Sequence, residues 1–144
     1  MRTRVLLLLI GATMALHPAE AAQSVWSGLV IANNVEQPQA APAQLSTIEE
    51  TLKDTFGYNQ FTIIGESQKT LKTGDEDWLA SSKYFSLHVD SKGTTPAGYL
   101  LDLKLYKEKE LLLETEAKLS KRSPLVIKGP LVGDGQLLLV LVVQ

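Results

Sequence analysis

Polar and apolar residues alternate through residues 99–119, and this alternation is the strongest structural signal in the chain. In both halves of the segment the odd positions are mainly apolar and the even positions between them mainly charged. A strand with one buried and one solvated face has this period of two. The charged residues 107–110 separate the halves, so the pattern predicts an antiparallel hairpin with arms at residues 99–106 and 111–119.

The register of this hairpin is less firmly predicted than its two faces. Pairing residues whose numbers sum to 218 places Lys104 opposite Glu114, which is favourable. The same register places Asp102 opposite Glu116, which is unfavourable. A shift of two residues changes the pairs but keeps the faces, whereas a shift of one would move charges onto the apolar face.

Several further segments have the composition of strands, because they are rich in β-branched and aromatic residues and bounded by turn-forming residues. We expect strands at residues 24–33, 60–65, 83–90, 125–128 and 136–143, with weaker signals at residues 66–71 and 78–79. The nearly continuous apolar run at residues 137–143 predicts either a central strand that is covered on both faces or one arm of a sandwich core. Glycine and proline predict loops at residues 91–98, 129–130 and 133–135.

One helix is expected, at residues 46–56. Ser46 followed by Glu49 matches a capping box, in which each residue satisfies a free backbone N–H at the helix start. Apolar residues recur every four positions from Ile48 onward and form a stripe that can cover a sheet. Gly57 follows, and glycine ends helices because it accepts a left-handed conformation.

Together these elements predict a mainly β fold: a single domain of about seven to eight mostly antiparallel strands, with the helix of the N-terminal half covering it. Either a sandwich or a curved sheet satisfies the pattern, because a sheet with one apolar face must bury that face. The expected core residues are Ile48, Leu52, Phe56, Phe61, Ile63, Phe85, Leu87, Leu101, Leu103, Leu105, Leu113, Leu139 and Leu141.

The first 21 residues have the pattern of a secretory signal peptide. Arg2 and Arg4 precede an apolar run at residues 5–16, and Ala19 and Ala21 supply small residues at a cleavage site. A membrane-spanning helix needs about 20 apolar residues, so the run is too short for an anchor. We therefore expect cleavage near Ala21 and an exported domain at residues 22–144, periplasmic or extracellular, with no transmembrane segment in the mature chain.

Charge and cysteine content exclude two classes of function. The chain has 14 Lys and Arg and 16 Asp and Glu, and removing Arg2, Arg4 and Glu20 leaves 12 and 15, a net charge of −3. Nucleic-acid binding depends on clustered positive charge, so no nucleic-acid partner is expected. The chain has no cysteine, which excludes disulfides and thiolate metal sites.

Acid–base chemistry has few candidate residues. His88 is the one histidine outside the predicted signal peptide, and on the solvated face of a strand we interpret it as an ordinary surface residue. No serine lies in a Gly-x-Ser-x-Gly turn. The sequence therefore predicts a protein that is not an enzyme and that has no catalytic residues, no metal and no cofactor.

Carboxylates supply the remaining chemical alternatives. Asp75, Glu76 and Asp77 offer oxygen ligands for a hard cation, but calcium loops space their ligands at alternate positions and need more oxygens. We therefore interpret the triplet as an acidic loop. A small hydrolase using Asp75, Asp77 or Asp102 is the least favoured alternative, because it needs two carboxylates flanking one cleft.

The leading functional hypothesis is a non-catalytic, exported protein-interaction module, such as an accessory of a bacterial envelope or secretion complex. Its expected partner is another envelope protein, because an open strand edge can accept a partner strand. The alternative is a carbohydrate- or lipid-binding β-domain whose aromatic side chains contact the ligand. The candidates for that contact are Trp26, Tyr58, Trp78 and Tyr84.

Overall fold

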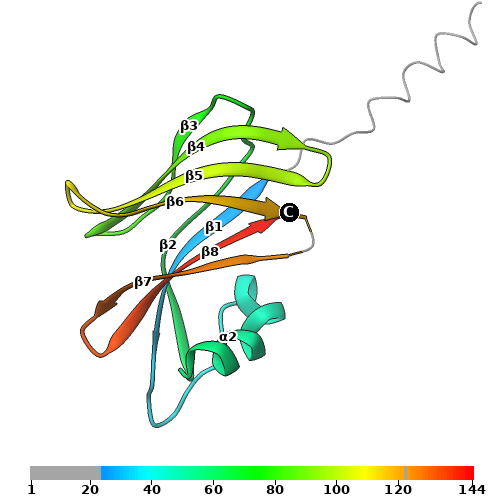
Figure 1. The fold of residues 1–144 in the computed structure, drawn as a ribbon. Coiled ribbons are helices and arrows are strands. Elements are labelled where there is room, and N and C mark those ends of the chain that lie inside the picture. Colours follow the sequence, from blue (N-terminus) through cyan, green and yellow to red (C-terminus); the bar gives the residue numbers. More distant parts are fainter. Residues whose placement is uncertain (1–23, 122) are drawn as a thin grey trace, which may run out of the picture.

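The computed structural model describes residues 24–121 and 123–144, and it shows a mainly β fold with two layers of strands (Figure 1). The predicted signal peptide lies outside the described residues. The strands are β1 Val25–Asn33, β2 Gln60–Lys69, β3 Glu76–Ser81, β4 Phe85–Thr95, β5 Gly98–Lys107, β6 Glu110–Ser120, β7 Leu125–Val132 and β8 Gly135–Val143. The eight strands of the described residues confirm the predicted class and strand number.

The strands form two antiparallel sheets of four. Sheet A has the order β2-β1-β8-β7, and sheet B has the order β3-β4-β5-β6. Their facing sides bury one apolar cluster, to which β5 contributes Leu101, Leu103 and Leu105 and β8 contributes Leu139 and Leu141. The arrangement is therefore a sandwich, the first of the two predicted alternatives.

The central strands of sheet A are apolar on both faces. Leu29 of β1 and Leu139 of β8 lie in the cluster between the sheets, whereas Val30 and Leu138 lie in a second cluster on the opposite face. All four side chains are fully buried, because successive residues of a strand point to opposite faces. This confirms the first alternative predicted for residues 137–143, a central strand covered on both faces.

A helical segment covers this opposite face of sheet A (Figure 1). It consists of the 3-10 helix η2, Ala43–Ile48, followed by the α-helix α2, Glu49–Phe56. Leu52 is buried in the second cluster, with Ile48 and Phe56 packed beside it, as the apolar stripe predicts. Gly57 has a positive φ of 76° and ends the helix as expected.

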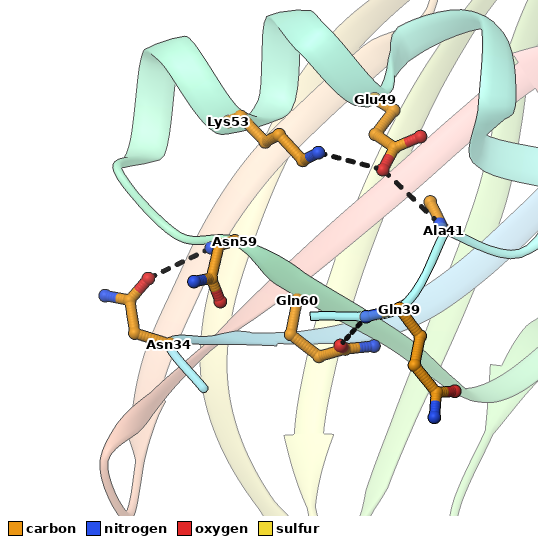
Figure 2. A network of polar contacts seen from close by, with 7 residues as sticks. All are labelled: Asn34, Gln39, Ala41, Glu49, Lys53, Asn59 and Gln60. Carbon is orange, nitrogen blue, oxygen red and sulfur yellow. Dashed lines mark hydrogen bonds and ion pairs between the residues drawn. The ribbon is translucent and has the colours of Figure 1, made fainter. Parts of the chain in front are cut away.

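The predicted start of the helix was wrong, because the helical segment begins at Ala43 rather than Ser46. No side chain caps η2 or α2, so the predicted capping box does not form. Instead, the carboxylate of Glu49 accepts a hydrogen bond from the backbone N–H of Ala41 and pairs with Lys53 at 3.1 Å (Figure 2). Glu49 thus connects the helix to the preceding segment rather than to its own first turn.

The segment between β1 and η2 is held by side-chain amides. The backbone N–H of Asn59 donates to Asn34 Oδ1 at 3.0 Å, and that of Gln39 donates to Gln60 Oε1 at 2.8 Å (Figure 2). The bond to Gln60 satisfies a backbone N–H of this segment that no strand pairs, which helps to hold a segment rich in alanine, glutamine and proline along the protein surface.

The predicted hairpin and its two faces are confirmed, and its register, which the sequence left open, is mainly the one with a sum of 218. From the Gly98–Ser120 pair to the Leu105–Leu113 pair, the two residue numbers of every β5–β6 pair sum to 218. A β-bulge then shifts the register by one, so that Lys107 pairs with Glu110. The bulge absorbs Leu112, which leaves this leucine partly exposed.

Two predicted loops were wrong. Residues 91–98 are mostly strand, because β4 continues to Thr95 with an irregularity between Ser91 and Gly93. Residues 129–130 lie within β7, where the register shifts between Lys128 and Leu131. The side-chain amide of the buried Gln136 donates to the carbonyl oxygens of both residues, so the irregular backbone is satisfied internally.

Candidate functional site

The face of sheet B that points away from the core carries four of the side chains singled out from the sequence, Glu76, Trp78, His88 and Asp102. Its residues lie in rows that run across the strands, because antiparallel pairing aligns one residue from each strand. One row contains Glu76 of β3, Asp90 of β4, Asp102 of β5 and Glu116 of β6. We call this set the acidic row.

The acidic row places four carboxylates at neighbouring positions. Strands lie about 4.8 Å apart, so each carboxylate is within a Debye length of the next. Like charges directly opposite each other destabilise a sheet. Among the described residues, the row makes one contact with a basic side chain, between Glu76 Oε1 and His88 Nε2 at 3.9 Å, which is an ion pair only when the imidazole is protonated. Lys104 and Lys118 lie at neighbouring positions of this face but form no ion pair with the row in the described part of the chain. The row is therefore a local concentration of negative charge.

The neighbouring row contains Trp78, His88, Lys104 and Glu114. The Trp78 ring meets the ring of His88 edge-on at 4.9 Å between centroids. It also meets the ring of Tyr106 edge-on at 5.7 Å, across the intervening strand β4. Trp78 is 48% exposed, so this aromatic group is accessible from solvent.

The three consecutive acids of residues 75–77 point to different partners. Asp75 accepts the backbone N–H of Lys72 at 2.7 Å and closes the turn before β3. Asp77 pairs with Lys69 of β2 at 3.0 Å. The Lys69 ammonium and the backbone N–H of Trp78 lower the pKa of Asp77 below its usual range. Glu76 alone joins the outer face of sheet B, so the triplet does not act as one loop of ligands.

The four predicted aromatic candidates do not share a surface. Trp26 is 5% exposed and packs in the cluster under the helix, where its Nε1 donates to Glu66 at 3.1 Å. Tyr58 packs against the same cluster. Tyr84 lies outside this cluster, beside the ammonium of Lys83, and Trp78 lies on the outer face of sheet B. The structure instead groups Trp78 with His88 and Tyr106.

Two cavities lie away from the acidic row. One, of about 350 Å³, is mostly apolar and includes Tyr99, Leu100 and Lys118 in its lining. Burial raises the pKa of Tyr99. The other, of about 420 Å³, lies near Tyr84 and Leu131. Neither lining contains the pair of facing carboxylates that the hydrolase alternative requires.

The strand β6 forms one edge of sheet B. In residues 24–121 and 123–144, β6 pairs with β5 on one side only, apart from a single bridge between Ser120 and Ser123 at its end. Its inward-facing residues Leu113, Thr115 and Ala117 are half-buried rather than buried, so the sandwich is incompletely covered here. Glu114 and Glu116 are exposed along the strand and form the part of the negative surface nearest this edge.

Other strand edges are protected in ways that β6 is not. At the opposite side of sheet B, the edge strand β3 lies against β2, where Ser67 Oγ donates to the carbonyl of Leu79. In sheet A, β7 contains Pro130, which has no backbone N–H to donate. The strand β6 has eleven residues and no proline, and no other segment of residues 24–121 and 123–144 pairs along its free edge.

No family model, curated protein or solved structure matches this chain. Within the described residues, no helix has both the length and the apolar character needed to cross a membrane. Fold and site together define an antiparallel two-sheet sandwich with an acidic outer face and an open strand edge.

The sequence contained part of the signal for this face. The period of two correctly placed His88, Asp90, Asp102 and Glu116 on the solvated side of their strands. It did not indicate that Glu76 and Asp90 lie opposite each other, because this pairing depends on the register of β3 against β4. The favourable contact of Tyr106 with Trp78 depends in the same way on three strands lying side by side.

Proposed function

We propose that the protein is a non-catalytic, exported interaction module that binds an extended segment of another protein along the free edge of β6. The single observation that supports this most strongly is that one edge of β6 is unpaired within the described residues, with half-buried apolar side chains facing inward. Unpaired N–H and C=O groups at a sheet edge form hydrogen bonds with an added strand. Such a strand would also cover Leu113 and Ala117.

The charges of β6 indicate the chemistry of the partner. Its outer side carries Glu114 and Glu116, and the acidic row continues behind them through Asp102. A strand added beside β6 would extend this row by one position. We therefore propose a partner segment in which Lys or Arg alternates with apolar residues, so that basic side chains face the glutamates.

Pairing between two copies of this chain through β6 is less favourable. In an antiparallel pair centred on Thr115, Glu114 of each copy would lie opposite Glu116 of the other. Centring the pair on Glu116 would bring the two copies of that residue together. Both arrangements place like charges directly opposite each other. A pair centred on Ala117 would place Glu116 opposite Lys118, but it would span only residues 114–120 of β6 and leave Leu113 uncovered. A basic partner segment therefore fits the full length of this edge better than a second copy does.

The test uses isotope-labelled protein and a nine-residue synthetic peptide of alternating lysine and valine. We expect added peptide to slow the hydrogen exchange of the β6 amides that do not bond to β5. A peptide of alternating glutamate and valine should have no such effect. The proposal would be overturned if the lysine peptide slowed amide exchange elsewhere in the protein instead of in β6, or if both peptides slowed the exchange of β6 equally.

A charge-reversed variant supplies the matched control. The double substitution Glu114→Lys and Glu116→Lys should abolish the protection by the lysine peptide and favour the glutamate peptide. The double substitution Glu50→Lys and Asp54→Lys changes the net charge equally at exposed positions of α2. This second variant should bind the lysine peptide as the unaltered protein does, and equal loss in both variants would indicate non-specific charge attraction.

The carbohydrate-binding alternative is supported by one observation, the exposed ring of Trp78 beside Tyr106. Aromatic rings with exposed faces contact the apolar faces of sugars. A glycan array probed with the protein and with the Trp78→Ala variant tests this alternative. Binding that depends on Trp78 would favour it over strand addition.

A further inference from the structure

We propose that Glu76, His88 and Asp90 bind a divalent transition-metal ion, of which Zn²⁺ is the representative, on the outer face of sheet B. One ligand atom from each residue can be chosen so that all three lie within 4.8 Å of one another. This site is separate from the free edge of β6, because β3 and β4 are at the opposite side of the sheet.

The donor set has a nitrogen as well as oxygens. One imidazole and two carboxylates suit borderline divalent ions such as Zn²⁺, whereas Mg²⁺ and Ca²⁺ prefer oxygen ligands alone. No partner for His88 could be identified from the sequence, which therefore indicated no metal site. The fold supplies two: Asp90 two residues along β4, and Glu76 from the neighbouring strand.

The position of the ligands is set by strand pairing. Glu76 lies directly opposite Asp90, and His88 lies opposite Trp78 in the next row. The edge-on contact with Trp78 at 4.9 Å restrains the His88 ring, whose side chain is 17% exposed. Two of the three ligands, His88 and Asp90, are thus half-buried, which reduces the entropy lost when an ion orders them.

The ligand atoms must move closer together by about 1–1.5 Å to bind one ion. Bonds of about 2.0–2.2 Å to Zn²⁺ at tetrahedral angles place two ligand atoms of one ion about 3.3–3.6 Å apart. Glu76 can make this adjustment, because its side chain is 67% exposed and already directs Oε1 towards His88 Nε2 at 3.9 Å. Water would complete the coordination, as it does where three protein ligands leave a position open.

Electrostatics favours a cation at this point of the face. Glu76 and Asp90 are a directly opposed pair of like charges, and Asp102 lies beyond Asp90 in the same row. The nearest basic position in the rows is Lys104, opposite His88, and it forms no ion pair in the described part of the chain. A divalent ion would neutralise the opposed pair and convert a repulsive contact into a bridging one.

The experiment is calorimetric titration of the purified protein with zinc chloride, starting from chelator-treated material. We expect saturation at one ion per chain. Glu76→Gln and His88→Gln should each weaken binding by about tenfold or more, because even loss of an outer-shell partner has an effect of 10- to 100-fold. The control variant Glu114→Gln, which is changed on the same face but outside the cluster, should bind zinc with the affinity of the unaltered protein.

A second measurement uses the fluorescence of tryptophan. Ni²⁺ quenches nearby indoles, and Trp78 adjoins the cluster whereas Trp26 lies under the helix on sheet A. Quenching should therefore disappear in Trp78→Phe and persist in Trp26→Phe. The proposal is overturned if zinc does not bind, or if quenching by Ni²⁺ disappears in Trp26→Phe instead of Trp78→Phe. It is also overturned if Glu76→Gln and His88→Gln bind zinc as tightly as Glu114→Gln does while their far-ultraviolet circular dichroism shows that they are folded.

Discussion

Asp102 lies directly opposite Glu116 across the β5–β6 pair, although Lys104, two residues further along β5, lies opposite Glu114. The hairpin therefore contains one unfavourable and one favourable charge pair at adjacent positions of the same face. The apolar residues between them set this register, because Leu103 and Leu105 must point into the core, where they are 1% and 0% exposed. The repulsion between Asp102 and Glu116 therefore lowers the free energy of unfolding.

The first prediction follows from this pair. Asp102→Asn should raise the free energy of unfolding by about 0.2–1 kcal/mol, because it removes like-charge contacts with Asp90 and Glu116. Urea denaturation at low ionic strength measures the change, which should shrink as salt is added. Lys104→Gln removes the favourable pair with Glu114 and should lower the free energy of unfolding by a similar amount. Loss of stability in Asp102→Asn would show that the row is not repulsive.

The second prediction tests the register of the hairpin. Leu105→Ala should lower the free energy of unfolding by about 2–5 kcal/mol, since the side chain is fully buried between the sheets. Leu112→Ala should change it by no more than about 0.5 kcal/mol, because the bulge leaves Leu112 37% exposed. Chemical denaturation of both variants provides the comparison. Equal losses would contradict the bulge between these positions.

The third prediction concerns the contact between β2 and β3, where the two sheets meet. A Cβ atom added at Gly65 would lie 2.1 Å from the carbonyl oxygen of Ser81, which belongs to the backbone and cannot rotate away. Gly65→Ala should therefore destabilise the fold by about 1–3 kcal/mol. Gly93→Ala is the control, because nothing lies within 4 Å of its added Cβ. Thermal unfolding that ranks the two variants in the opposite order would refute this close approach.

The fourth prediction concerns pH. Burial raises the pKa of Tyr99 above the ordinary value of 10.0, so the folded protein holds this proton more tightly than the unfolded chain does. Stability should therefore be unaffected by this group below pH 10.0 and should fall as the pH rises above it. Absorbance titration of tyrosinate should show a late component that is absent in Tyr99→Phe. A Tyr99→Phe titration with the late component intact would assign it to another tyrosine.

Much of the fold was predictable because its signals are local. Alternation in residues 99–119 identified both arms and both faces of the hairpin, since successive side chains of a strand always point to opposite sides. The stripe of Ile48, Leu52 and Phe56 identified a helix in the same way. The errors occurred where tertiary contacts satisfy irregular backbone, as Gln136 does for residues 129–130.

The sequence by itself determined which side of the alternating strands β4, β5 and β6 is buried, because the period of two depends on the order of residues alone. It also determined the chemical character of His88, Asp90, Asp102 and Glu116 as solvated side chains. Only the tertiary structure decided that four carboxylates form one row and that Glu76, His88 and Asp90 meet. Strand order, bulges and register set those distances, and they result from packing two sheets and a helix around shared apolar clusters rather than from any one segment.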